Sequence, residues 1–254
     1  MDVLYANGDS FVFGMECIKD FDRAEENKEL AFPKHVAGGL GCNTYINNAY
    51  NGATNEFIFR NTIFDLLELE KQGTKPADVF VLIGWTSLHR FEINGEAWYN
   101  TIPEYRVDPN NIENKDVNPE FVDFKSLFVS PSSKTNVTTP TVEYNTDHNV
   151  LPFCVDFIWH DCLQIPQQQA RILALHGFLK SRGYRHLFVN AVDSFESGTV
   201  YGDTLNFYKL SNESFFKWAL EMYPSEHRAN NHFSPIPHKE YGKLLLDYIV
   251  KNKL

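Results

Sequence analysis

The sequence predicts one α/β domain, a three-layer, flavodoxin-like α/β/α sandwich around a central parallel sheet of about five strands. Short, apolar, β-prone segments alternate along the chain with longer segments of helical periodicity. One strand candidate, Val79–Trp85, is apolar throughout, which is typical of a strand covered on both faces. With 254 residues, 43% of them hydrophobic, the chain is long enough to bury one large core.

The elements follow one another in the order that a doubly wound sheet requires. Strands are expected at 3–6, about 42–46, 79–85 and 186–192. Helices are expected at about 57–73, capped by Thr54 or Asn55, at about 153–182 with a break near Pro166, at 214–222 and at 239–249. Residues 19–29 are charged and predict a solvated loop or short helix, and the glycines of residues 38–41 predict a flexible approach to the second strand.

A long segment, from about 93 to 152, has no periodicity and is rich in Asn, Pro, Ser and Thr with scattered aromatic residues. Irregular segments of this length in a compact domain are usually functional loops or insertions. We therefore expect a single domain over residues 1–254 with an irregular insertion at about 93–152, near the mouth of any site. The alternative is a solvated loop with no role in binding.

The composition argues against several classes of ligand. The net charge is −10 and no cluster of Lys and Arg is present, so nucleic-acid binding is not expected. The four cysteines are scattered and predict buried thiols in a reducing compartment. The histidines show no metal spacing, so we expect neither a metal nor another cofactor.

No targeting segment is expected. The first strand begins almost at Met1, which leaves no room for a signal peptide, and no apolar run approaches the roughly 20 residues of a membrane helix. We expect a cytoplasmic protein that does not bind membranes, with association with a virus particle left open. The sequence carries no indication of the oligomeric state.

Gly8-Asp9-Ser10 lies between the first strand candidate and an apolar segment that could open a helix. A serine at such a turn has its hydroxyl free at the carboxyl end of a strand and its N–H at a helix start. That is where a nucleophile would be placed. The alternative is a helix N-cap, where Asp and Ser are common for structural reasons.

Three further polar segments are expected near Ser10, because ligands gather beyond the carboxyl ends of the strands in an open α/β sheet. They are residues 47–55, residues 84–87 and the loop at 230–238 before the last helix. Together they could supply oxyanion donors and a histidine base.

In this order the motifs resemble those of the SGNH (GDSL-type) hydrolase family, over most of the chain except residues 93–152. The resemblance implies that Ser10 is the nucleophile and that His232 is the general base. It also implies an oxyanion hole formed by the N–H groups of Ser10 and Gly52, with Thr86 at the position of the family's asparagine.

The sequence departs from the family pattern at two positions. The third block usually reads Gly-x-Asn-Asp, and Thr86 replaces its asparagine. The last block usually reads Asp-x-x-His, and Ala229 replaces its aspartate. Loss of one oxyanion donor typically costs about 10²–10³ in kcat, and loss of the orienting acid about 10⁴ in a serine protease. Glu226 or a backbone carbonyl would then orient His232.

The remaining site candidates each have a structural alternative. Arg90 could bind a substrate group, but a surface ion pair is the default for such a residue. Ser87 and Asn55 could contact substrate or form turns and caps, and Trp85 could be a pocket wall or a core residue. His238, at the position of a later family histidine, is expected to pack at the start of the last helix.

We therefore expect a serine hydrolase that cleaves ester bonds through a Ser–His dyad or an incomplete triad. Its substrate would be a small-molecule or carbohydrate ester, since O-acyl carbohydrates suit the aromatic, Asn-rich segment. The alternative is a catalytically weakened SGNH fold that serves as a carbohydrate-binding or virion-associated structural protein. A flavodoxin-like nucleotide binder is disfavoured, because residues 7–10 lack the glycine spacing that cradles phosphates.

Overall fold

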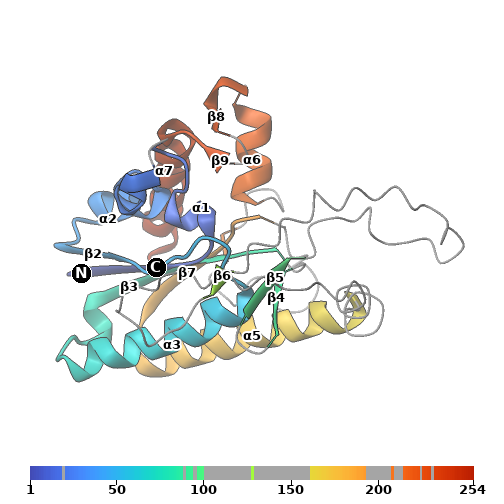
Figure 1. Cartoon of the computed structure of the whole chain (residues 1–254). Coiled ribbons are helices and arrows are strands. Elements are labelled where there is room, and N and C mark those ends of the chain that lie inside the picture. Colours follow the sequence, from blue (N-terminus) through green and yellow to red (C-terminus); the bar gives the residue numbers. More distant parts are fainter. Residues whose placement is uncertain are drawn as a thin grey trace, which may run out of the picture.

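The computed structural model describes residues 1–18, 21–87, 90–93, 96–99, 127–128, 161–192, 207–208, 214–223, 225–229 and 232–254. At its centre is a parallel sheet in the order β2-β1-β3-β7 (Figure 1). The strands are β1 (Val3–Asn7), β2 (Thr44–Asn47), β3 (Val79–Trp85) and β7 (Arg185–Asn190). The mixed α/β class with a parallel sheet is as predicted from the sequence.

The sheet has four strands in the described part of the chain, so the expected five are not confirmed. Beyond β7, Phe207 forms only an isolated parallel bridge with Phe188. The Tyr208 N–H donates to the Phe188 carbonyl at 2.8 Å, which continues the pairing by one bond. In the described part of the chain, pairing beyond β7 is thus limited to this bridge and hydrogen bond.

Helices cover the sheet on both sides (Figure 1). Neighbouring residues of a strand point to opposite faces, so Leu4 and Ala6 join one buried cluster while Val3 and Tyr5 join another. The first cluster includes side chains of α2 (Phe32–Leu40), α6 (Phe215–Met222) and α7 (Pro235–Asn252). The second includes side chains of α3 (Asn55–Lys71) and α5 (Asp161–Arg182).

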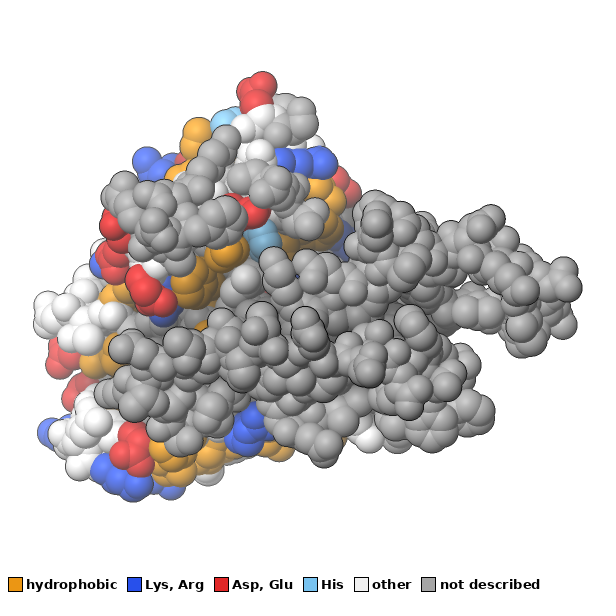
Figure 2. Space-filling model, in the orientation of Figure 1, with side chains coloured by type: hydrophobic (Ala, Val, Ile, Leu, Met, Phe, Trp, Pro, Cys, Tyr) orange, Lys and Arg blue, Asp and Glu red, His pale blue; other side chains and the backbone are white. Residues whose placement is uncertain are grey.

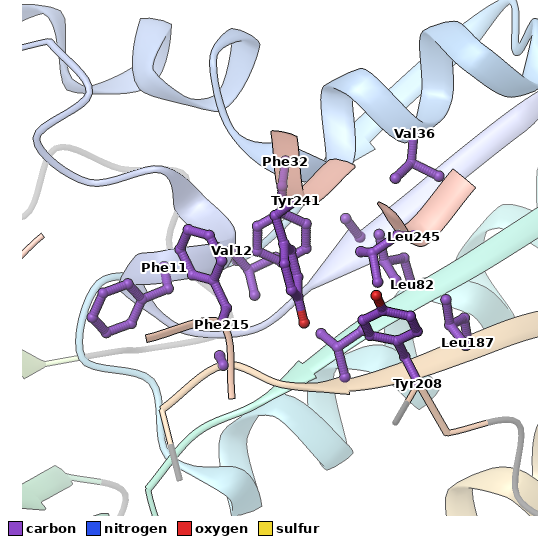
Figure 3. Close-up of a cluster of buried hydrophobic side chains, with 14 of the residues drawn as sticks. Phe11, Val12, Phe32, Val36, Leu82, Leu187, Tyr208, Phe215, Tyr241 and Leu245 are labelled. Carbon is purple, nitrogen blue, oxygen red and sulfur yellow. The ribbon is translucent and has the colours of Figure 1, made fainter. Parts of the chain in front are cut away.

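Figure 3 shows the first of these clusters, with Phe11 close to Phe215. The two rings meet edge to face at a centroid distance of 6.0 Å. Phe32 and Tyr241 pack beside them, again edge to face, at 5.2 Å. This aromatic core connects the segment after Ser10 to the C-terminal part of the chain.

Several predicted elements are confirmed, and others differ in length. The strand Val79–Trp85 is present and fully buried, and Thr54 caps α3 by accepting the Phe57 N–H at 3.1 Å. Pro166 lies inside α5 instead of breaking it, and residues 153–160 are outside the described part. Helix α7 begins at Pro235, earlier than the predicted 239, because proline is well tolerated in the first turn.

Helix α2 was not predicted, because its sequence contains two glycines that disfavour a helix by about 1 kcal/mol each. Gly39 of α2 and Gly242 of α7 allow the two helices to approach closely. A Cβ atom on Gly39 would lie 2.1 Å from a methyl carbon of Leu246, and one on Gly242 would lie 2.7 Å from the Cβ of His35. Tight packing between the helices thus outweighs the weak local propensity.

Short elements complete the described chain: α1 (Ser10–Phe13), η1 (Phe21–Glu29), η2 (Pro76–Asp78), β4 (Arg90–Ile93), β5 (Glu96–Tyr99), β6 (Leu127–Phe128), η6 (Ser225–His227), β8 (Arg228–Ala229) and β9 (His232–Phe233). Strands β4, β5 and β6 form a separate antiparallel sheet. Apart from residue 93 and strands β5 and β6, the predicted insertion at 93–152 lies outside the described residues.

The described surface carries charges of both signs. Figure 2 shows acidic and basic side chains interspersed with hydrophobic ones on one face of the molecule. Within the described ranges, no helix combines the length and apolar character needed to cross a lipid bilayer.

Candidate active site

Ser10 lies at the sharp turn between β1 and α1. Asp9 caps α1, because its carboxylate accepts the Phe11 N–H at 3.0 Å. Ser10 is the first residue of the helix and is buried, and Gly14 ends the helix with a φ of 80°. The N–H of a first helical residue has no partner inside its helix. The turn therefore presents both the Ser10 hydroxyl and its N–H at the carboxyl end of β1.

Two glycines allow α1 to lie directly against the sheet. A Cβ atom on Gly8 would lie 2.2 Å from a methyl carbon of Val12, and one on Gly84 would lie 2.3 Å from the same carbon. Since real Cβ atoms do not approach so closely, any larger residue would push α1 and Ser10 away from the strand ends. The close approach of Val12 explains why glycine occupies positions 8 and 84.

The turn after β2 is tied to the turn before Ser10. The Tyr50 N–H donates to the Gly8 carbonyl at 3.0 Å. Gly52 is buried in this turn and has a φ of 82°, a backbone conformation that favours glycine. Within the described residues, no acceptor is found for the N–H groups of Ser10 and Gly52. These are the two backbone donors that the family resemblance implies for an oxyanion hole, in which Thr86 is the third residue.

Asp9 is fully buried and its charge is compensated. Its second carboxylate oxygen accepts the Thr86 hydroxyl at 2.6 Å and lies 3.1 Å from Arg90 Nη1. The Arg90 guanidinium also reaches the Ala53 carbonyl at 3.5 Å. The single hydrogen of the Thr86 hydroxyl is thus directed to Asp9, and its role as an oxyanion donor stays a prediction.

The four residues predicted to bind substrate are placed as follows. Arg90 pairs with Asp9, and Asn55 is buried with its carboxamide bonded to the backbone after β3. Asn55 accepts the Thr86 N–H at 2.9 Å and donates to the carbonyl oxygens of Thr86 and Ser87 at 3.1 and 3.3 Å. Trp85 is fully buried against Phe188. The side chains of Asn55, Trp85 and Arg90 therefore stabilise the fold at the carboxyl ends of the strands.

His232 lies beside the segment that carries Ser10. Its ring packs on the ring of Phe11 at a centroid distance of 4.9 Å. Its Nδ1 lies 3.0 Å from Oε2 of Glu16, and the two side chains are only 16% and 12% exposed. Between Ser10 and His232 themselves, both in the described part, no hydrogen bond is formed. The structure thus places the His232 ring against Phe11, the residue that follows Ser10.

Glu16 was missed at the sequence level. The sequence predicts that Glu226 or a backbone carbonyl orients His232, and Glu226 is exposed on η6. Glu16, whose carboxylate faces His232, comes from the turn after α1, 216 positions away from His232. Its φ of 65° is unusual for a residue with a side chain. The signal available in the sequence was an acidic residue shortly after the candidate nucleophile.

His238 differs from His232 in its burial and in the partner of its Nδ1. It is fully buried, stacks on Phe32 and accepts the Phe32 N–H on Nδ1 at 3.3 Å. Burial lowers the pKa of His238 from 6.5 to about 3. The expectation that it packs at the start of the last helix is confirmed.

Cys17 is a further potential nucleophile near His232. Its Sγ lies 3.6 Å from the Phe233 carbonyl, and burial raises the pKa of its thiol to about 12. A thiol with such a pKa stays protonated and unreactive. In the described part of the chain, no group of three His, Cys, Asp or Glu side chains is arranged to hold a metal ion.

The comparisons with known proteins give little guidance. No protein-family model and no curated protein matches the chain. Among solved structures, the chain resembles a protein assigned by name to the G-D-S-L lipolytic family, from Desulfitobacterium hafniense DCB-2. The identity is 13%, the TM-score is 0.49, and the match covers 97% of this chain and 99% of that chain. A likeness this distant does not show what the residues of this chain do.

Proposed function

We propose that this chain is a serine hydrolase of the SGNH type that cleaves ester bonds, with Ser10 as nucleophile and His232 as general base. The observation that carries the proposal is the position of His232. Its ring packs on Phe11, the residue after Ser10, and its Nδ1 faces a carboxylate. A histidine from the C-terminal part of the chain thus lies beside the segment that carries both the candidate nucleophile and a carboxylate.

The reaction would proceed through an acyl-enzyme. His232 Nε2 takes the proton of Ser10, the hydroxyl oxygen attacks the ester carbonyl, and the N–H groups of Ser10 and Gly52 stabilise the oxyanion. The imidazolium returns the proton to the leaving alcohol, and a water activated by His232 then releases the acid. Nε2 must reach the hydroxyl when substrate binds, and catalytic hydrogen bonds commonly tighten only in the substrate complex.

The same proposal extends to the architecture. It includes a single three-layer domain over residues 1–254, in which the Phe207 bridge marks the fifth strand. The substrate would be an ester of a small acyl group, and the carbohydrate ester inferred from residues 93–152 remains part of the proposal.

The test is the replacement Ser10→Ala. We expect it to reduce hydrolysis of p-nitrophenyl acetate to the background rate, because the acyl-enzyme would form on the Ser10 hydroxyl, which this variant lacks. Ser181→Ala is a matched control, since Ser181 is exposed on α5 and, within the described residues, its hydroxyl donates only to the Phe178 carbonyl. Unchanged turnover in the Ser10 variant would contradict the proposal.

The competing function is a non-catalytic binding protein that keeps the fold. It is favoured by the lack of a hydrogen bond between Ser10 and His232, both described, and by the engagement of the Thr86 hydroxyl with Asp9. A fluorophosphonate probe separates the two functions. Covalent labelling at Ser10 supports the hydrolase, and no labelling at high probe concentration supports the binding protein.

A further inference from the structure

We propose that Glu16 is the residue that orients His232, so that the site is a Ser10–His232–Glu16 triad, an inference that rests on the proposed function. The acid would then lie in the turn that follows the nucleophile's own helix. This would compensate for Ala229, the position at which the sequence lacks a carboxylate.

The contact between Glu16 and His232 selects one tautomer of the imidazole. A carboxylate oxygen can only accept a hydrogen bond, so Nδ1, 3.0 Å from Oε2 of Glu16, must carry the hydrogen. The proton position is inferred from this partner. Nε2 is then left with a lone pair, as a base that accepts the Ser10 proton requires.

The backbone between Ser10 and Glu16 holds the nucleophile and the acid in a fixed relation. Gly14 ends α1, and the Met15 N–H donates to the Ser10 carbonyl at 2.8 Å. The Cys17 N–H donates to the Gly14 carbonyl at 3.1 Å, which closes the next turn of the chain. Any movement of α1 therefore moves Ser10 and Glu16 together relative to His232.

The conformation of Glu16 supports a role for its side chain. Its φ of 65° lies in the left-handed region, which glycine adopts without strain and a glutamate does not. Such strained positions cluster at functional sites, and here the strained residue directs its carboxylate to His232. With 12% exposure, the carboxylate is also largely withdrawn from water, which strengthens the contact.

Glu16→Gln is the first test variant, measured with p-nitrophenyl acetate. We expect kcat to fall by about 10²–10⁴-fold with KM changed less than about twofold, since a positioning residue does not touch the substrate. Glu16→Asp should retain more activity than Glu16→Gln, because it keeps the charge. Glu29→Gln is the matched control, since Glu29 is exposed and pairs only with Lys34 in the described part, and its kcat should equal that of the wild type.

Glu16→Gly is the second variant, chosen because glycine suits a φ of 65° and should fold. Added formate should raise its kcat and leave that of the wild type unchanged, because a free carboxylate can occupy the vacated position. A wild-type kcat in Glu16→Gly or Glu16→Gln would overturn the assignment of Glu16. A large loss in Glu226→Gln with none in Glu16→Gln would overturn it as well.

The outcome for Ser10 separates this inference from the proposed function. If Ser10→Ala abolishes turnover and the Glu16 variants do not affect it, Glu16 is not the orienting acid and the hydrolase remains. If Ser10→Ala is fully active, the proposed function fails together with the triad.

Discussion

His232 and His238 lie close together in the sequence, and each packs its ring against a phenylalanine. The centroid distances are 4.9 Å from His232 to Phe11 and 6.0 Å from His238 to Phe32. The two sites differ in the partner of Nδ1. In His232 that atom faces the Glu16 carboxylate, and in His238 it accepts the backbone N–H of Phe32.

The partners impose opposite tautomers. Nδ1 of His232 carries hydrogen because its partner can only accept, whereas Nδ1 of His238 must be bare because its partner donates. His238 therefore carries its proton on Nε2, which is buried without an acceptor in the described part of the chain. An aromatic neighbour thus does not distinguish a candidate base from a core histidine. The partner of Nδ1 and the exposure of the side chain to solvent distinguish the two histidines.

The largest effect is expected from His232→Ala. We expect kcat to fall by about 10⁴, since the base is lost, while the free energy of unfolding changes by about 1 kcal/mol or less. The small change in stability follows from the position of His232 in a two-residue strand and from its burial, which is less complete than that of His238. Kinetics with p-nitrophenyl acetate and denaturant unfolding measure the two quantities.

His238→Gln is the counterpart of this variant. Its kcat per folded molecule should match that of the wild type, because His238 is fully buried in the core. Equal losses of kcat in the two variants would show that the distinction between the two histidines is wrong.

The second effect is a dependence of stability on pH. Burial is the main reason that the pKa of His238 falls from 6.5 to about 3, with smaller contributions from His232 and His35. Between these pH values the unfolded chain binds a proton that the folded chain does not. The contribution of His238 to stability is therefore complete above about pH 6.5 and is lost as the pH falls toward 3.

At most 1.36 kcal/mol is lost per pH unit for one such group, so about 2–3 kcal/mol should be lost between pH 6.5 and 4.5. In His238→Gln the loss over this interval should shrink by about that amount. Urea unfolding at the two pH values provides the measurement. The part that remains is expected from groups such as His186, whose pKa burial lowers to about 4. An identical pH dependence in wild type and variant would refute the effect of burial.

Features determined by local sequence could be predicted. The apolar run of β3 and the cap at Thr54 depend on residues near one another in the chain, and both were recognised. The turn at Ser10 was recognised for the same reason, since a short strand, a small polar turn and an apolar segment adjoin there.

Features that depend on tertiary contacts could not be predicted. Helix α2 is stabilised against α7 through Gly39 and Gly242, whose effect on packing is opposite to their helix propensity. The contact of Glu16 with His232 joins positions 216 apart, and the acidic residue after the candidate nucleophile does not by itself indicate His232 as its partner. The sequence therefore predicts Glu226 or a backbone carbonyl as the partner of His232, whereas the structure places Glu16 beside its Nδ1.

The smallest effect concerns the two phenylalanines beside the histidines. Phe11→Leu and Phe32→Leu should each reduce the free energy of unfolding by about 1–2 kcal/mol, because both rings are buried in one aromatic cluster. Only Phe11→Leu should also reduce kcat, by about tenfold, because a small displacement of His232 weakens its alignment with Ser10. Stability and kcat of the two variants can be measured in parallel. Since the substitutions are chemically identical, an equal kcat in both would mean that Phe11 supports the core alone, and a loss confined to Phe11→Leu ties the ring to the position of His232.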